Sequence, residues 1–474
     1  MVGERIVVAM KATNAIRRSR QAPTPREGVG MAQNLNSPSA PPQSDEDGAV
    51  NPSPRVLRRV ITASFIGNFV EWFDYAVYGY LATVIAVVFF PEAEPTTGLL
   101  ATFAVFAISF VIRPIGGLVW GHFGDKIGRR TALSLSILIM SASTFCIGLI
   151  PGFDQIGYLA PVLLLLVRMV QGFSAAGEYA GASAFLAEYA PDRKRGLFTS
   201  VVPASTAAGL LFGSLIAALL TAVLSTEQLE GWGWRLPFLL AAPMGLIGRY
   251  IRLKLEDTPK FQEMEQKVES NAPLSILFTH HRRAIAIAFG VTCLNAVGFY
   301  LILSYMPTYL SEVLNVGHTA SFVAASIALA CYIVFIFGMG ALSDRFGRKR
   351  VLIAASVCFA VFTVPLFSAL GAVGIVGIVL IQIVLCAFLT MNDGTLPTFL
   401  AEIFPTQVRY SGFAFSFNTA NALFGGTAPF VATLLIELTG STLAPAWYLV
   451  AAALVAMGAM LMARETSQRP LADT

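Results

Sequence analysis

The sequence reads Gly121-His-Phe-Gly-Asp-Lys-Ile-Gly-Arg-Arg130 at one point and Gly340-Ala-Leu-Ser-Asp-Arg-Phe-Gly-Arg-Lys349 at another. A second motif also occurs twice, as Ala187-Glu188, Pro191 and Arg195 and again as Ala401-Glu402, Pro405 and Arg409. Two motifs that recur in the same order, at nearly the same offset, indicate an internal repeat. The repetition predicts a chain built from two halves of like fold.

The composition around these motifs is that of a membrane protein. The chain has 474 residues, of which 55% are hydrophobic and 13% charged, and its mean hydropathy is +0.68. Apolar stretches of about 20 residues, the length that spans a bilayer, recur from Val60 to Met462. Continuous apolar runs such as Ile375 to Leu385 favour helices over alternating barrel strands. We therefore expect an all-α membrane protein of about twelve transmembrane helices, the first over residues 60–90.

The distribution of charge orients these helices. Basic residues fall on one set of alternate loops, and the loops of the other set contain no Lys or Arg. The positive-inside rule then places both termini in the cytoplasm. The net charge of +4 is explained by these loops, so binding to nucleic acid is not expected. The five cysteines lie inside apolar runs without metal-ligand or disulfide spacing, and we interpret them as core residues.

Breaks in the apolar pattern divide the chain into five segments. Residues 1–54 are rich in Pro, Ser and charge and are predicted to be a disordered cytoplasmic tail. An N-terminal six-helix lobe is predicted at residues 55–253, a cytoplasmic linker at 254–282, a C-terminal six-helix lobe at 283–464 and a cytoplasmic tail at 465–474. The repeat indicates parallel halves related by a pseudo-twofold axis along the membrane normal.

The repeated loop motif resembles the signature loops of the major facilitator superfamily. Five further motifs resemble its metabolite:proton symporter family: Gly67-Asn-Phe-Val-Glu-Trp-Phe-Asp-Tyr-Ala-Val-Tyr-Gly79, Arg113-Pro-Ile-Gly-Gly117, Gln171-Gly-Phe-Ser-Ala-Ala-Gly-Glu-Tyr179, Pro191-Asp-Arg-Lys-Arg-Gly196 and Gly233-Trp-Arg-Leu-Pro-Phe238. Within that family, Ser143 to Pro151, Ala182 to Tyr189 and Arg464 to Pro470 are most similar to the proline/glycine betaine osmoprotectant symporters.

This resemblance implies the major facilitator fold, with a central site near the bilayer midplane and alternating access by rocking of two pseudo-symmetric lobes. It implies uptake of a small zwitterionic osmolyte, such as proline or glycine betaine, with a proton across the inner membrane. The alternatives are proton symport of a di- or tricarboxylate such as 2-oxoglutarate or citrate, and a transporter-like sensor. No cofactor is expected because the proton gradient supplies the energy, and a monomer is the expected transport unit.

Charged residues in mid-membrane are costly and usually serve function, so the first helix is the first place to look for binding residues. It carries a polar set, most of which falls on one helical face: Asn68, Glu71, Asp74, Tyr75 and Tyr78. A carboxylate there either binds a proton or pairs with an internal arginine. Arg113 and Arg168 either pair with those carboxylates or bind a substrate carboxylate. Glu178 is either a proton site or an interhelical hydrogen-bond partner.

In the second half, the polar groups expected to face the cavity are Asn295, Tyr300, Tyr305, Asn392 and Asp393. Aromatic faces suit a quaternary ammonium group through cation–π contact, although any one of these tyrosines is as readily a packing or membrane-interface residue.

The charged residues of the repeated loop motif are expected to latch the two halves and to govern conformational switching: Asp125, Arg129, Asp344 and Arg348. The sequence contains no nucleophile elbow, no phosphate-binding loop and no metal motif. An enzyme is therefore not expected, and neither is a metal site.

Overall fold

The computed structural model describes residues 54–93, 95–253 and 273–471 of the chain. The predicted tail at residues 1–54 lies almost wholly outside the described residues, and so does most of the predicted linker at residues 254–282. The last part of that linker forms a short helix, α15 (Pro273–His280).

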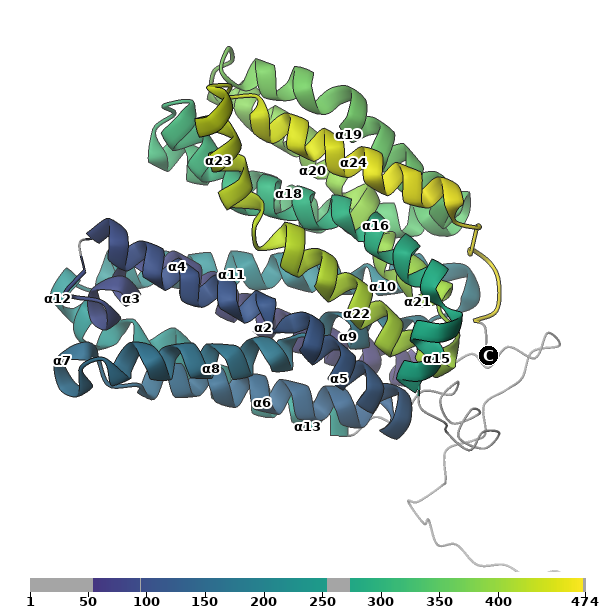
Figure 1. The fold of residues 1–474 in the computed structure, drawn as a ribbon, viewed down its shortest axis with the longest axis horizontal. Helices are drawn as coiled ribbons and strands as arrows, with labels where there is room; N and C mark the ends of the chain where they lie inside the picture. Colours follow the sequence, from purple (N-terminus) through teal and green to yellow (C-terminus); the bar gives the residue numbers. More distant parts are fainter. Residues whose placement is uncertain (1–53, 94, 254–272, 472–474) are drawn as a thin grey trace, which may run out of the picture. The chain divides into compact units, whose positions relative to one another are not determined.

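The described part of the chain before residue 254 forms the N-terminal lobe (Figure 1). Its long helical segments are α2 (Pro54–Tyr80), α4 (Pro95–Val111) with α5 (Arg113–Ile127), α6 (Arg129–Leu149), α8 (Leu159–Ala175) with α9 (Glu178–Tyr189), α10 (Arg195–Thr199) with α11 (Val201–Val223), and α13 (Arg235–Leu253). Short helices are α3 (Ala82–Phe89), α7 (Phe153–Ile156) and α12 (Thr226–Gln228). Helix α2 packs on α11, and α6 packs on α13.

The C-terminal lobe repeats this order. Its long helical segments are α16 (Arg282–Phe299), α18 (His318–Phe346), α19 (Arg348–Leu370), α20 (Ile375–Asp393) with α21 (Leu396–Ile403), α22 (Arg409–Ala420) with α23 (Ala428–Thr439), and α24 (Ala444–Met462). Helix α16 continues through a π-helical turn at Tyr300–Tyr305 and α17 (Met306–Thr308). Within the lobe, α18 packs on α20, and α24 packs on both α16 and α19.

Among the described residues, eleven helices are long and apolar enough to cross a membrane, and the number rises to twelve when one bent pair is counted as a span. That pair is α2 and α3, which bend by 67° at Leu81. The first span, predicted as one helix over residues 60–90, is therefore broken near its end.

The two copies of the loop motif fold alike because each contains a glycine in a conformation that other residues rarely adopt. Gly128 separates α5 from α6 with φ 98° and ψ 145°, and Gly347 separates α18 from α19 with φ 96° and ψ 152°. Glycine has no Cβ to clash at positive φ, so it permits this reversal between consecutive helices. The repeat seen in the sequence is thus a repeat of backbone geometry.

The lobes meet along a small set of helices. Helix α5 packs on α22, α10 and α11 pack on α18, and α9 packs on α21 and α22. The C-terminal residues after α24 also join the lobes, since the guanidinium of Arg195 donates to the carbonyl oxygen of Arg469 at 2.7 Å. Glu465, in the predicted tail at residues 465–474, accepts hydrogen bonds from the backbone N–H groups of Arg348 and Lys349 at 2.9 and 3.1 Å.

Candidate functional site

The first polar cluster joins α2 to α4 and α5 through an ion pair. Arg113 Nη2 donates to Glu71 Oε1 at 2.8 Å, and both side chains are buried. The guanidinium lies over the rings of Tyr75 and Phe110, at 4.7 and 4.4 Å from their centroids. Burying a charge is tolerable only when it is paired, so Glu71 and Arg113 hold these helices together as a unit.

The second cluster joins α2 to α6 and α8. Asp74 Oδ2 accepts from Arg168 Nη1 at 2.9 Å and from Gln171 Nε2 at 2.5 Å. Gln171 also accepts from Arg168 at 2.5 Å and donates to Thr144 at 2.7 Å. Arg168 lies 3.7 Å from the ring centroid of Tyr78. This arginine therefore has two acceptors, one charged and one neutral.

The third cluster lies nearer the repeated loops and contains a partner that sequence reasoning missed. Glu178 pairs with Arg252, which is 74 positions away in the chain, through both carboxylate oxygens. Arg252 also donates to the carbonyl oxygen of Leu133 at 2.7 Å. Arg252 lies at the end of its apolar run, where the sequence gives no sign that it reaches back into the lobe.

Gly67 provides the space for this pair, and its replacement by alanine is predicted to destabilise the N-terminal lobe. A Cβ at residue 67 would overlap the Arg252 guanidinium and the Glu178 carboxylate. Overpacking of this kind typically costs about 1–3 kcal/mol. Thermal unfolding of the purified protein should therefore begin several degrees lower in Gly67→Ala. Gly79→Ala on the same helix is the control, since nothing lies within 4 Å of its new Cβ; equal melting temperatures would contradict the prediction.

Asn68 of α2 joins this helix to α11 by hydrogen bonds. Its Nδ2 donates to the carbonyl oxygen of Val202 at 2.9 Å and contacts the hydroxyls of Ser205 and Thr206 at 3.0 and 2.7 Å. Thus the polar face of the first helix is used mainly inside its own lobe, where it binds neighbouring helices.

A small cavity lies between the two lobes, with about 20 Å³ open to the centre of a water-sized sphere. A volume of this size holds about one water molecule, so a solute can bind here only when the lining residues move apart. Seven helices of the N- and C-terminal lobes and the π-helical turn after α22 supply its lining: Trp72, Tyr179, Pro203, Thr206, Asn295, Phe299, Tyr332, Asp393, Phe417 and Asn421. Half of these residues carry aromatic rings.

Asp393 is the acidic residue of the cavity lining. Its Oδ1 accepts from Asn295 Nδ2 at 2.7 Å, and its Oδ2 accepts from the Tyr332 hydroxyl at 2.6 Å. Both donors are neutral. Among the ion pairs of the described residues, none involves Asp393, whereas Glu71, Asp74 and Glu178 each have an arginine.

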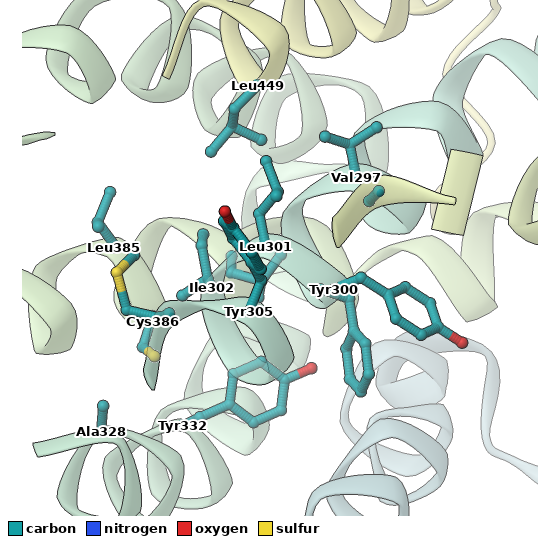
Figure 2. Close-up of a cluster of buried hydrophobic side chains, with 14 of the residues drawn as sticks. Val297, Tyr300, Leu301, Ile302, Tyr305, Ala328, Tyr332, Leu385, Cys386 and Leu449 are labelled. Carbon is teal, nitrogen blue, oxygen red and sulfur yellow. The ribbon is translucent and has the colours of Figure 1, made fainter. Parts of the chain in front are cut away.

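Of the thirteen residues predicted to bind substrate or proton, the cavity lining contains Asn295 and Asp393. Tyr75 and Tyr300 lie nearby, around Phe110, with ring centroids 5.6 and 6.0 Å from it. Tyr305 instead shares a hydrogen bond with Thr433 at 3.0 Å inside the C-terminal lobe. Figure 2 shows Tyr305 among Leu301 and Ile302, while the ring of Tyr300 extends away from that group.

Asn392, next to Asp393, is buried but is absent from the lining, and its side chain makes no hydrogen bond within the described residues. The predicted binding residues also did not include the aromatic lining, namely Trp72, Tyr179, Phe299, Tyr332 and Phe417. An aromatic residue in a membrane helix is usually a packing residue. These rings differ from packing residues only because five different helices bring them together at one cavity, which the sequence does not show.

The loop-motif aspartates form reciprocal contacts between the lobes. Asp125 of α5 accepts from the backbone N–H groups of Tyr410 and Ser411, at 3.1 and 2.8 Å, where α22 begins. Asp344 of α18 accepts in the same way from Gly196 and Leu197, at 2.8 and 2.9 Å, where α10 begins. Each carboxylate thus binds the positive end of a helix from the opposite lobe.

Two glutamates of the second repeated motif, one in each lobe, each pair with one arginine from each lobe. Glu188 accepts from Arg129 at 3.1 Å and from Arg409 at 2.6 Å. Glu402 pairs with Arg348 at 3.3 Å and with Arg195 at 3.6 Å. We call this set of contacts the latch; it comprises Asp125, Arg129, Glu188, Arg195, Asp344, Arg348, Glu402 and Arg409. The latch closes this end of the lobes in the described structure.

Comparison with known proteins identifies the family. Residues 60–276 match the family model described as "Sugar (and other) transporter", and residues 288–473 match that of the "Major Facilitator Superfamily". The "Glycine betaine/proline/ectoine/pipecolic acid transporter OusA" of Dickeya dadantii is 41% identical over 88% of this chain and 85% of its own length. The chain belongs to the major facilitator superfamily. It is accordingly a multi-pass membrane transporter and not an enzyme.

Further relatives of this major facilitator protein support the same family. The "Proline/betaine transporter" of Escherichia coli K12 is 40% identical over 88% of this chain and 85% of its own. The "Putative proline/betaine transporter" of Staphylococcus haemolyticus is 38% identical over 85% and 86%. Among solved structures, the proton:xylose symporter XylE bound to 6-bromo-6-deoxy-D-glucose superposes with a TM-score of 0.74 at 17% identity, over 88% of this chain and 98% of that one. The predicted all-α major facilitator fold is confirmed.

Proposed function

We propose that this transporter takes up a small zwitterionic osmolyte, such as proline or glycine betaine, together with a proton by alternating access. The observation that carries the proposal is the lining of the small cavity between the lobes, which combines aromatic rings with a carboxylate whose described hydrogen-bond donors are neutral. Such a site favours a solute with a cationic group. The relatives named for proline and betaine support the same substrate class.

The organic-acid alternative is disfavoured by charge. No lysine or arginine lines the described cavity, while Asp393 would repel an anion there. Arg113 and Arg168, which would have to bind the acid, are engaged with Glu71 and Asp74. A di- or tricarboxylate would have to displace both pairs.

Asp74 is the proposed proton carrier. When Asp74 is protonated, Arg168 retains Gln171 Oε1 as an acceptor, so its own charge stays hydrogen bonded. Arg113 has no comparable side-chain acceptor besides Glu71 among the hydrogen bonds described. Protonation therefore costs less at Asp74 than at Glu71. The proton gradient would supply the energy, with no cofactor and with the monomer as the transport unit.

The proposed orientation in the cytoplasmic membrane follows from the basic residues at the latch end of the lobes. Exposed or partly exposed basic side chains gather there: Lys126, Arg130, Arg193, Lys194, Arg345 and Arg350. By the positive-inside rule this end faces the cytoplasm, which places both termini inside as well.

Uptake of labelled proline, glycine betaine and 2-oxoglutarate by a transporter-deficient bacterial host expressing this chain tests the function. We expect the first two compounds to accumulate and a protonophore to abolish that accumulation. Accumulation of 2-oxoglutarate alone would establish the organic-acid alternative. Sodium-dependent uptake that resists the protonophore would contradict proton coupling, and no uptake of any compound would favour a sensor.

A further inference from the structure

Asp393 differs from the other carboxylates predicted to bind substrate or proton because it has no cationic partner among the described residues. Glu71, Asp74 and Glu178 each contact a guanidinium, whereas Asp393 contacts an amide and a phenol. The residue is 1% exposed. A carboxylate buried in this way without a cation is costly, and the cost is recovered when a ligand brings the missing positive charge.

The rings beside Asp393 come from both lobes and form two pairs. Trp72 of α2 and Phe299 of α16 lie 5.1 Å apart, centroid to centroid. Tyr179 of α9 stacks on Phe417 of α22 at 4.4 Å with an interplanar angle of 4°. Ring faces attract alkylammonium groups, and several rings around one carboxylate form a cage that suits a quaternary ammonium.

The N-terminal lobe also offers a hydrogen-bond donor to the cavity. The indole Nε1–H of Trp72 is buried and makes no hydrogen bond within the described residues, although the side chain lines the cavity and is 8% exposed. A buried indole usually finds a partner for its N–H group. A carboxylate oxygen of a bound solute would provide that partner.

We propose that the cavity binds the two ends of a zwitterion through different groups. Asp393 and the surrounding rings bind the ammonium group, and the Trp72 indole N–H donates a hydrogen bond to the carboxylate. This inference rests on the proposed function and specifies how the same site recognises its substrate. Asp393 belongs to the C-terminal lobe and Trp72 to the N-terminal lobe. A single zwitterion therefore bridges the lobes, whereas an isolated cation or an isolated anion interacts with only one of the two residues.

Two isosteres of glycine betaine test the two ends. In 3,3-dimethylbutanoate a carbon replaces the quaternary nitrogen, so shape and carboxylate remain while the positive charge is lost. Choline keeps the trimethylammonium group and replaces the carboxylate by a hydroxymethyl group. Binding of all three compounds to the purified full-length protein is measured by titration calorimetry at one pH. Wild type is expected to bind betaine at least about tenfold more tightly than either isostere.

The variants Asp393→Asn and Trp72→Phe assign each preference to its residue. Asp393→Asn should lower the betaine to 3,3-dimethylbutanoate affinity ratio several-fold, to what the rings alone provide, and leave the betaine to choline ratio largely intact. Trp72→Phe keeps a ring but lacks the N–H, and should reduce only the betaine to choline ratio. Glu437→Gln, at an exposed carboxylate of the same lobe, is the matched control and should retain both ratios.

A merely structural role for Asp393 would weaken all three ligands by the same factor, and that result would overturn the proposal. Equal binding of betaine and 3,3-dimethylbutanoate by wild type would overturn it without any variant, so the test does not depend on Asp393→Asn folding. Failure of wild type to bind or take up betaine and proline would instead contradict the proposed function itself.

Discussion

Replacement of Asp74 by asparagine is expected to abolish concentrative uptake while leaving exchange of labelled for unlabelled substrate intact. Asparagine mimics the protonated carboxyl group and still accepts a hydrogen bond from Arg168, but it cannot release a proton. One proton driven through 100 mV is worth about 2.3 kcal/mol, which supports roughly a 50-fold concentration ratio of an uncharged or zwitterionic solute. In proteoliposomes with that potential, the accumulation ratio of Asp74→Asn should fall to about one.

The control for this experiment is Glu227→Gln, which removes an exposed carboxylate of the same lobe and should accumulate substrate like wild type. Protonophore-sensitive accumulation by Asp74→Asn would show that another group carries the proton. Loss of exchange as well as accumulation would show that the Asp74 to Arg168 pair, at 2.9 Å, is needed for the structure of the lobe.

Replacement of Glu188 by glutamine is expected to open the latch end of the lobes. Glu188 in the N-terminal lobe is shared by Arg129 of its own lobe and Arg409 of the other. Breaking a buried pair typically costs about 3–5 kcal/mol. The contact between Glu188 and Arg409 joins opposite lobes, so this cost falls on the closed state. A loss of about 3 kcal/mol shifts the equilibrium roughly 100-fold toward opening.

Spin labels on Lys126→Cys and Arg345→Cys measure this shift, because both side chains are exposed and lie on opposite lobes at the latch end. In a background without the native cysteines, Glu188→Gln should increase the population at longer label separations. Glu227→Gln is the control, because its exposed carboxylate lies outside the latch. A distance distribution like that of wild type would show that the latch does not hold the lobes.

Half of the latch residues were identified from the repeated loop motif. Asp125, Arg129, Asp344 and Arg348 were identified because their motif is repeated, and the structure brings them together at one end of the lobes. Glu188, Glu402, Arg195 and Arg409 appeared in the second repeated motif without an assigned role. Their pairing depends on how the lobes meet, and a motif carries no information about that contact.

The helical class, the two halves and their internal repeat were determined by the sequence alone, because hydropathy over about 20 residues and a glycine at each motif reversal are local properties. Charge partners were decided only by the tertiary structure. Glu178 has Arg252, while Asp393 has no cation among the described ion pairs. Both carboxylates follow long apolar stretches of the sequence and look equivalent there. Which of them meets an arginine depends on packing between helices far apart in the chain, and the cavity and its aromatic lining exist only once those helices have packed.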